Sequence, residues 1–157
     1  MTVKVPDEPY RLNYLARLPL EESVSMLQLD KMEHPFAYTL EVLTDDGPKE
    51  QTVDLVETFN YLLGLDVHRL ESWENEHDKP KGKPRRYRVV KGQDRSGRRY
   101  LVVWRDMTDL NPKAEREFLE ARLKQEKEPF DQMFVNGDSA TPGFESLDGL
   151  FKRLMTE

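Results

Sequence analysis

The order of elements near residues 100–136 limits the fold of this chain more than any other feature. The stretch YLVVW (100–104) is apolar on both faces, as is typical of a strand in the interior of a sheet. A charged segment from Pro112 to about Lys127 has the pattern of a surface helix, and a second short apolar strand, QMFV (132–135), follows it. A strand, a helix and a strand in this order predict a right-handed βαβ unit with parallel strands.

Further strands and helices extend this unit. Residues 87–90 (YRVV) have strand character, and the turn residues after them predict a hairpin with the first strand of the βαβ unit. Residues 38–43 alternate in the same way and predict a separate strand before a turn. The stretch from Asp54 to Gly64 predicts an amphipathic helix, because Asp54 can cap its first turn and glycine suits the left-handed residue that ends it.

These elements predict one α/β domain over residues 1–157, with an α+β arrangement as the alternative. We expect one mixed sheet with flanking helices, the last of them at 147–154. A chain of 157 residues is long enough to bury about two thirds of its unfolded surface, so a hydrophobic core can form. Residues 1–36 are expected to be an extended lead-in. Residues 74–86, with two prolines and many charges, are expected to be a basic exposed loop.

The basic residues are concentrated in one part of an acidic chain. The net charge is −6, yet residues 79–105 hold eleven Lys and Arg residues against one acidic residue, Asp94, a net charge of +10. A basic segment in an acidic protein can bind a polyanion such as DNA while the remaining surface stays unattracted. The alternative is that these cations are solvated or paired with acidic residues. The candidate phosphate contacts are Lys83, Arg85, Arg86, Arg88, Arg95, Arg98 and Arg99.

Two aspartates after predicted strands form an alternative candidate site. Asp106 follows the first strand of the βαβ unit and Asp138 follows the second. Ligands of open α/β sheets lie at the carboxyl ends of the strands, so these carboxylates could hold a divalent metal for phosphodiester or phosphoryl-transfer chemistry. Such residues are also ordinary turn residues and helix caps, and we expect no metal site. Of the two tryptophans, Trp73 is the more open candidate for base stacking, whereas Trp104 is expected in the core.

Catalytic signatures are absent from the sequence. It has no cysteine, three scattered histidines and no glycine-rich phosphate loop. The stretch PDEPY (6–10) looks like the polar-Pro-Pro-aromatic loop with which amino-methyltransferases hold an extruded base. However, Glu8 replaces the first proline, and no glycine-rich turn for S-adenosylmethionine follows. We expect no catalytic residue and no cofactor in this chain.

Three stretches of the sequence carry a resemblance to a known family. TVDLVETFNYLLGLDV (52–67), YRVVKGQDRSGRRYLVVWRDMT (87–108) and FDQMFVNGDS (130–139) occur in this order. They resemble the region that follows the catalytic domain in the modification subunits of bacterial type III restriction-modification systems and related adenine-specific DNA methyltransferases. Residues 9–42 also look like that region, so the likeness covers nearly the whole chain. The catalytic half of these proteins has no counterpart here, so the chain is either a domain of a longer protein or a stand-alone relative.

The resemblance implies a non-catalytic accessory C-terminal domain that supports subunit assembly, DNA contact or both. The implied partners are the methyltransferase catalytic region, which alone would bind S-adenosylmethionine, and the restriction subunit. Two other functions stay open: a metal-dependent nuclease-like or phosphoryl-transfer domain, and a purely structural protein-interaction domain. No stretch approaches the roughly 18 apolar residues of a membrane-spanning helix, so we expect a cytoplasmic protein without a membrane partner.

Overall fold

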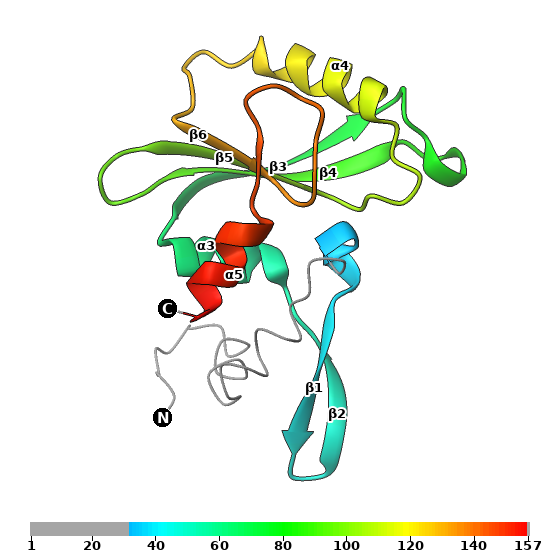
Figure 1. Ribbon diagram of the computed structural model, residues 1–157, viewed down its shortest axis with the longest axis vertical. Helices are drawn as coiled ribbons and strands as arrows, with labels where there is room; N and C mark the ends of the chain where they lie inside the picture. The colour runs from blue at the N-terminus through cyan, green and yellow to red at the C-terminus, as the bar shows by residue number, and fades with distance from the viewer. Residues whose placement is uncertain (1–31, 157) are drawn as a thin grey trace.

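Five strands form one mixed sheet in the computed structural model, which describes residues 32–156 (Figure 1). The strand order is β3-β4-β5-β6-β7; β3, β4 and β5 are antiparallel neighbours, and β5, β6 and β7 are parallel neighbours. The strands are β3 (Asp66–Asn75), β4 (Arg85–Gln93), β5 (Arg99–Arg105), β6 (Gln132–Val135) and β7 (Glu145–Ser146). The predicted α/β fold with a mixed sheet and a single domain is confirmed.

The βαβ unit is confirmed in its order and in its strand direction. Helix α4 (Pro112–Leu123) connects β5 to the parallel strand β6 and covers one face of the sheet (Figure 1). The Asn111 side chain caps α4 by accepting a hydrogen bond from the backbone N–H of Ala114 (3.1 Å). The helix ends four residues before the predicted end at Lys127. Its last carbonyls accept hydrogen bonds from residues three positions later instead of four, as in the bond from the Gln125 N–H to Arg122 O (3.0 Å).

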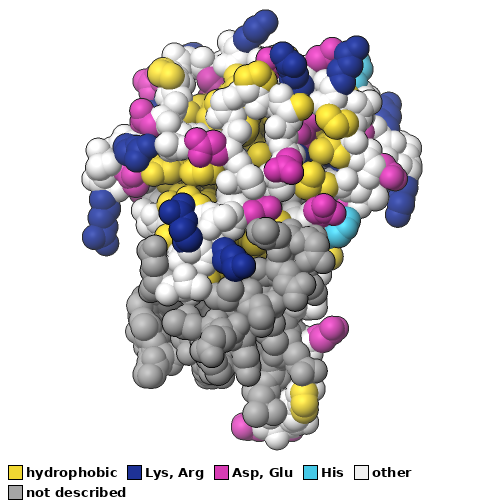
Figure 2. Space-filling model, viewed as in Figure 1, with side chains coloured by type: hydrophobic (Ala, Val, Ile, Leu, Met, Phe, Trp, Pro, Cys, Tyr) yellow, Lys and Arg dark blue, Asp and Glu magenta, His cyan; other side chains and the backbone are white. Residues whose placement is uncertain are grey.

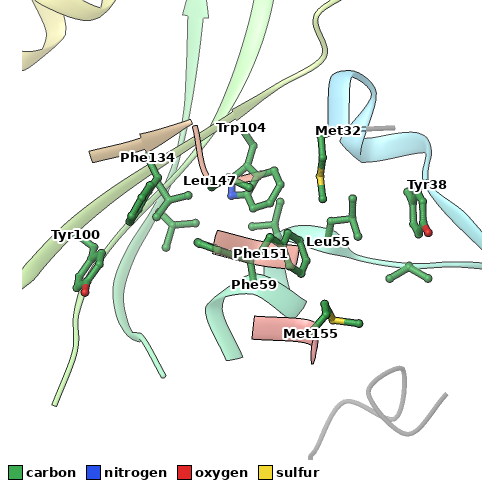
Figure 3. Close-up of a cluster of buried hydrophobic side chains, with 14 residues drawn as sticks. Met32, Tyr38, Leu55, Phe59, Tyr100, Trp104, Phe134, Leu147, Phe151 and Met155 are labelled. Atoms are coloured by element: carbon green, nitrogen blue, oxygen red, sulfur yellow. The ribbon is translucent and has the colours of Figure 1, made fainter. Parts of the chain in front are cut away.

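Two helices and a short turn cover the opposite face of the sheet. They are α3 (Leu55–Leu63), α5 (Asp148–Thr156) and the 3-10 turn η2 (Pro35–Ala37). An aromatic cluster fills the space between these helices and the sheet, and Figure 3 shows Phe59 of α3, Trp104 of β5 and Phe151 of α5 meeting in it. Trp104 is fully buried, as predicted. The sheet is therefore the middle layer of three.

The ends of α3 are as predicted. Asp54 Oδ1 accepts a hydrogen bond from the Glu57 backbone N–H (3.0 Å), and Gly64 has the left-handed backbone conformation (φ 73°) that ends the helix.

Figure 1 also shows a hairpin that extends away from the five-stranded sheet. It consists of β1 (Thr39–Thr44), which confirms the strand predicted at 38–43, and β2 (Gly47–Thr52), which the sequence did not predict.

Two glycine substitutions are expected to change stability in opposite directions. Gly64→Ala should lower the free energy of unfolding by about 1 kcal/mol, because alanine is strained at positive φ. Gly149→Ala, near the start of α5, should raise it by about 0.5 kcal/mol, because alanine restricts the unfolded chain without strain here. An added Cβ meets no atom within 4 Å at either position, so packing does not obscure the comparison. Thermal unfolding measures both shifts, and two shifts of the same sign would contradict the backbone explanation.

The loop predicted at 74–86 is wrong at both of its ends. Residues 74–75 belong to β3, which extends from Asp66 to Asn75, and residues 85–86 begin β4. Between them lies the short 3-10 turn η3 (Pro80–Gly82). Trp73, predicted to be the more open tryptophan, is buried beneath α4, where its ring contacts Phe118. Sequence periodicity missed β3 because it is an edge strand with a register shift between Val67 and Arg69 and many exposed side chains.

The lead-in predicted for residues 1–36, including PDEPY, lies outside the described residues except at its end. There the chain is not extended: η2 begins at Pro35, and Met32 is buried in the aromatic core (Figure 3). Among residues 32–156, no helix combines the length and the apolar character that crossing a membrane requires.

Candidate nucleic-acid interface

Arg85 is one of two buried arginines in the predicted DNA-binding segment. It is 4% exposed, and its Nε donates a hydrogen bond to Asp78 Oδ2 (2.8 Å). Its other guanidinium nitrogens donate to the carbonyl oxygens of Asp106 and Thr108. The prediction of Arg85 as a phosphate contact is therefore wrong for this structure, because the side chain is used to hold the loop after β5.

Arg105 is the second buried arginine, and it lies where the parallel strands β5 and β6 end. It forms a two-pronged ion pair with Glu115 of α4, with Nε donating to Oε2 (2.6 Å) and Nη2 donating to Oε1 (3.1 Å). It also donates to the carbonyl oxygens of Asn136 and Asp138. Tyr87 completes the network by donating its hydroxyl hydrogen to Glu115 Oε2 (3.1 Å). The place where α/β proteins usually bind ligands is thus filled by the protein's own polar side chains.

Asp106 and Asp138, the alternative metal ligands, do not belong to one metal-binding cluster. No group of three or more His, Cys, Asp or Glu side chains within residues 32–156 is placed to hold a metal. Asp138 is exposed, and its backbone carbonyl accepts a hydrogen bond from Arg105. Asp106 Oδ1 instead accepts hydrogen bonds from the backbone N–H (2.9 Å) and the hydroxyl group (2.6 Å) of Thr108. These contacts are typical of a turn.

Several of the remaining cations are paired with acidic side chains. Lys91 bonds to Glu126 (2.7 Å) and lies 3.3 Å from Glu71. Arg99 lies 3.4 Å from Glu128, and its guanidinium also donates to the Pro129 carbonyl (2.6 Å). The acidic partners come from β3 and from the segment after α4, which explains why the charge of residues 79–105 looked isolated in the sequence. Figure 2 shows basic side chains interspersed with acidic ones on the face in view.

Apart from Lys79, which lies 3.7 Å from Glu76, the exposed cations of residues 79–105 form two groups at opposite ends of the β4–β5 hairpin. Arg95 and Arg98 lie at its turn, and a second group lies where β4 begins. This second group, named here the η3 cluster, consists of Lys81, Lys83, Arg86 and Arg88. Because β4 has nine residues, the two groups are roughly 25 Å apart. The basic segment predicted from the sequence is therefore divided into two separate groups of exposed cations.

The η3 cluster surrounds a surface cavity with an aromatic wall. The cavity has a volume of about 440 Å³ and is lined by the four cations together with Phe36, Pro80, Pro84, Arg85, Asp106 and Thr108. Phe36 is 41% exposed, which is unusual for phenylalanine in a chain with a large core. The Arg88 guanidinium lies over the Phe36 ring at 5.9 Å from its centre. A cation–π contact of this kind uses the charge of the guanidinium and leaves its N–H groups available.

Most of the η3 cluster has no acidic partner in the part of the chain that the structure describes. Lys81, Lys83 and Arg88 have no ion pair with any described residue, and Arg86 pairs with Glu74 (2.9 Å), which is exposed. An exposed ion pair of this kind contributes little stability, so a phosphate group can compete for Arg86. The sequence identified Lys83, Arg86 and Arg88 but missed Phe36, because no local pattern distinguishes an exposed phenylalanine from a core one.

Asp106 also lines this cavity, and its side chain is partly exposed. Partial burial raises the pKa of Asp106, but the hydrogen bonds from Thr108 and the nearby His34 ring lower it by more. The net pKa is below the usual value for aspartate. His34 Nδ1 lies 3.2 Å from Asp106 Oδ2 and joins the segment before β1 to the loop after β5. The lining of the cavity therefore combines the η3 cluster and the buried Arg85 with one carboxylate that hydrogen bonds hold in place.

Comparisons of the chain with models of known protein families, with curated proteins and with solved structures found no match.

Proposed function

We propose that the protein is a nucleic-acid-binding accessory module whose η3 cluster contacts backbone phosphates. The observation that carries this proposal is a set of three cations, Lys81, Lys83 and Arg88, that form no ion pair with a described residue and surround a cavity with an exposed aromatic wall. Lysine and arginine side chains that are exposed and unpaired can neutralise phosphates without first breaking an internal ion pair. Cations beside an exposed aromatic ring are the usual composition of single-stranded nucleic-acid sites.

The resemblance to the region after the catalytic domain of type III modification subunits gives this module a context. In that context the chain would assist an adenine-specific DNA methyltransferase by holding DNA, by assembling subunits, or by both. The polar network of Arg105, Glu115 and Tyr87 supports a non-catalytic role, because it satisfies its own hydrogen bonds at the ends of β5 and β6.

The DNA contact is tested by the salt dependence of binding. We expect the wild-type protein to bind duplex or single-stranded DNA with an affinity that falls steeply as salt rises. Replacing Lys83 and Arg88 together by alanine should reduce the slope of log affinity against log salt by about two, because each lost phosphate contact reduces it by about one. Fluorescence anisotropy at several salt concentrations measures both quantities.

The matched control is the double variant Arg95→Ala with Arg98→Ala. It removes the same charge at the other end of the hairpin. Arg98 lines a cavity of about 610 Å³ there and lies over the Tyr100 ring (5.9 Å), but Tyr100 and Phe134, the aromatic residues of that cavity, are buried and offer no exposed ring. We expect its salt slope to stay within about half a unit of the wild-type value, because a lost phosphate contact would change it by about one. Equal losses in both double variants would show diffuse attraction, and no binding at low salt would contradict the DNA role.

Subunit assembly is the second candidate function. Strands β1 and β2 form a sheet of their own, and neither pairs with another described strand. An isolated two-stranded hairpin is only marginally stable in water, so packing against another surface would stabilise it. Light scattering of the chain alone and mixed with a methyltransferase catalytic region tests this role, with a stable complex as the expected result. If the masses do not change on mixing, assembly is excluded for that partner.

A further inference from the structure

We propose that the cavity beside Phe36 holds one unpaired nucleobase with an exocyclic amine at purine position 6 or pyrimidine position 4, while the η3 cluster holds the phosphates around it. This inference rests on the proposed nucleic-acid binding and specifies the ligand: single-stranded DNA or RNA, with adenine or cytosine preferred over thymine or uracil. Three features of the cavity support it: a fixed aromatic wall, cations in its lining without an ion pair to any described residue, and one anionic acceptor.

The aromatic wall is held in place by the backbone around it. Pro35, the neighbour of Phe36, is buried, and the Ala37 N–H donates to the His34 carbonyl (3.2 Å) within η2. The Met107 N–H donates to the Glu33 carbonyl (2.8 Å), which joins this segment to the loop after β5. Phe36 is therefore an exposed ring on a fixed support. A base can stack on it without first ordering a mobile loop, and each stacked base strengthens binding by a factor of about 5 to 150.

The cations at the edge of the cavity are placed for phosphates. Lys81 has a left-handed backbone conformation (φ 55°), which is uncommon for a residue other than glycine. Hydrogen bonds from the Gly82 N–H to Lys79 O (3.1 Å) and from the Lys83 N–H to Pro80 O (3.2 Å) maintain this turn. Arg88 adds a guanidinium that already lies against the ring. A base on Phe36 would thus have Arg88 and the lysines of η3 in the lining of the same cavity for its flanking phosphates.

Asp106 gives the cavity a preference among bases. An ionised carboxylate only accepts hydrogen bonds, and it has about four acceptor positions. Thr108 uses two of these on Oδ1, whereas the one contact of Oδ2 with a described residue is His34, and the side chain is 42% exposed. The amine of adenine or cytosine can donate to Oδ2. Thymine and uracil present a carbonyl oxygen at that position, which the carboxylate repels.

The experiment compares four single strands of equal length, about ten nucleotides each: oligo-dA, oligo-dC, oligo-dT and an abasic strand that has only the backbone. Fluorescence anisotropy gives the Kd of each. The wild-type protein should bind oligo-dA and oligo-dC at least about fivefold more tightly than the abasic strand, from the stacking of one base. It should bind oligo-dT less tightly than either.

Variants separate the ring from the acceptor. Phe36→Ala should bring oligo-dA down to the affinity of the abasic strand and leave the abasic strand unchanged, whereas Phe36→Trp should keep the difference. Tyr61→Ala, which removes another exposed ring on α3, is the matched control and should change neither. Asp106→Asn, which can both donate and accept, should remove the discrimination against oligo-dT. Circular dichroism of each variant confirms folding, and Phe36→Trp keeps the test valid if the alanine variant unfolds.

Several results would overturn the inference, and they can be told apart. If oligo-dT or the abasic strand binds as tightly as oligo-dA, or if Phe36→Ala weakens all strands equally, the base site is wrong while phosphate binding stands. If no strand binds at low salt, the proposed function itself fails. If polyglutamate competes as well as oligo-dA, the surface recognises acidic peptides, and both proposals are overturned.

Discussion

Glu115→Ala is expected to lower the free energy of unfolding by about 3–5 kcal/mol, one of the two largest effects in this protein. Arg105 and Glu115 are both fully buried, and the Arg105 guanidinium donates two hydrogen bonds to the Glu115 carboxylate. Removing the carboxylate leaves a buried guanidinium without its counter-charge and the Tyr87 hydroxyl without its acceptor. Urea unfolding followed by fluorescence measures the change. The free energy of unfolding of a native protein is only about 5–15 kcal/mol, so this variant would lose a large part of its stability.

The control for this prediction is Glu117→Ala. Glu117 is exposed on the same helix, so its replacement should change the free energy of unfolding by at most about 0.5 kcal/mol. A double variant, Arg105→Met with Glu115→Leu, should be less destabilised than Glu115→Ala alone, because it removes the stranded charge as well. If Glu115→Ala and Glu117→Ala have equal effects, the buried ion pair does not stabilise the fold.

Phe59→Ala is expected to destabilise the protein by a similar amount, about 3–5 kcal/mol. The Phe59 ring is fully buried at the centre of the cluster in Figure 3, with its centre 5.9 Å from that of Trp104 and 5.3 Å from that of Phe151. It also meets Phe134 of β6 edge to face at 6.3 Å. Alanine would leave a cavity where α3, α5 and the sheet meet, and these elements cannot close it without separating from other partners.

Two variants test this explanation. Tyr61→Ala removes an exposed ring from the same helix and should change the free energy of unfolding by at most about 0.5 kcal/mol. Phe59→Leu keeps most of the volume and should cost about 1.5 kcal/mol or less if its neighbours repack. Urea midpoints rank the three variants. A Phe59→Ala midpoint as close to the wild-type value as that of Tyr61→Ala would show that the aromatic cluster is not the centre of the core.

Local signals made much of the fold predictable from the sequence. Asp54, Gly64 and Asn111 mark helix ends because their contacts reach only a few residues along the chain. The apolar run at 100–104 indicated the central strand because interior strands of a sheet are buried on both faces. Strand β3 was missed for the opposite reason: it is an edge strand whose side chains are mostly exposed, so it lacks an apolar pattern.

The candidate site was predictable only in part, because long-range contacts assemble it. The sequence indicated Lys83, Arg86 and Arg88 through their charge, but it did not separate them from Arg85, which is buried by its contacts with Asp78 and the loop after β5. A charge count along the sequence cannot distinguish cations that are buried and stabilise the fold from exposed cations that can bind a ligand. Phe36 enters the cavity from about fifty residues away in the sequence, and no spacing rule connects it with η3.

Two groups of arginines among the described residues differ in their evolutionary freedom. Arg85 and Arg105 are fixed by the interior, whereas Arg88, Arg95 and Arg98 lie on the surface and form no ion pair with the described residues. Exchanging the latter would change which ligand the protein attracts and how strongly, with little penalty to folding. The same scaffold could therefore acquire a new binding preference by surface substitution alone, while its interior stays unaltered.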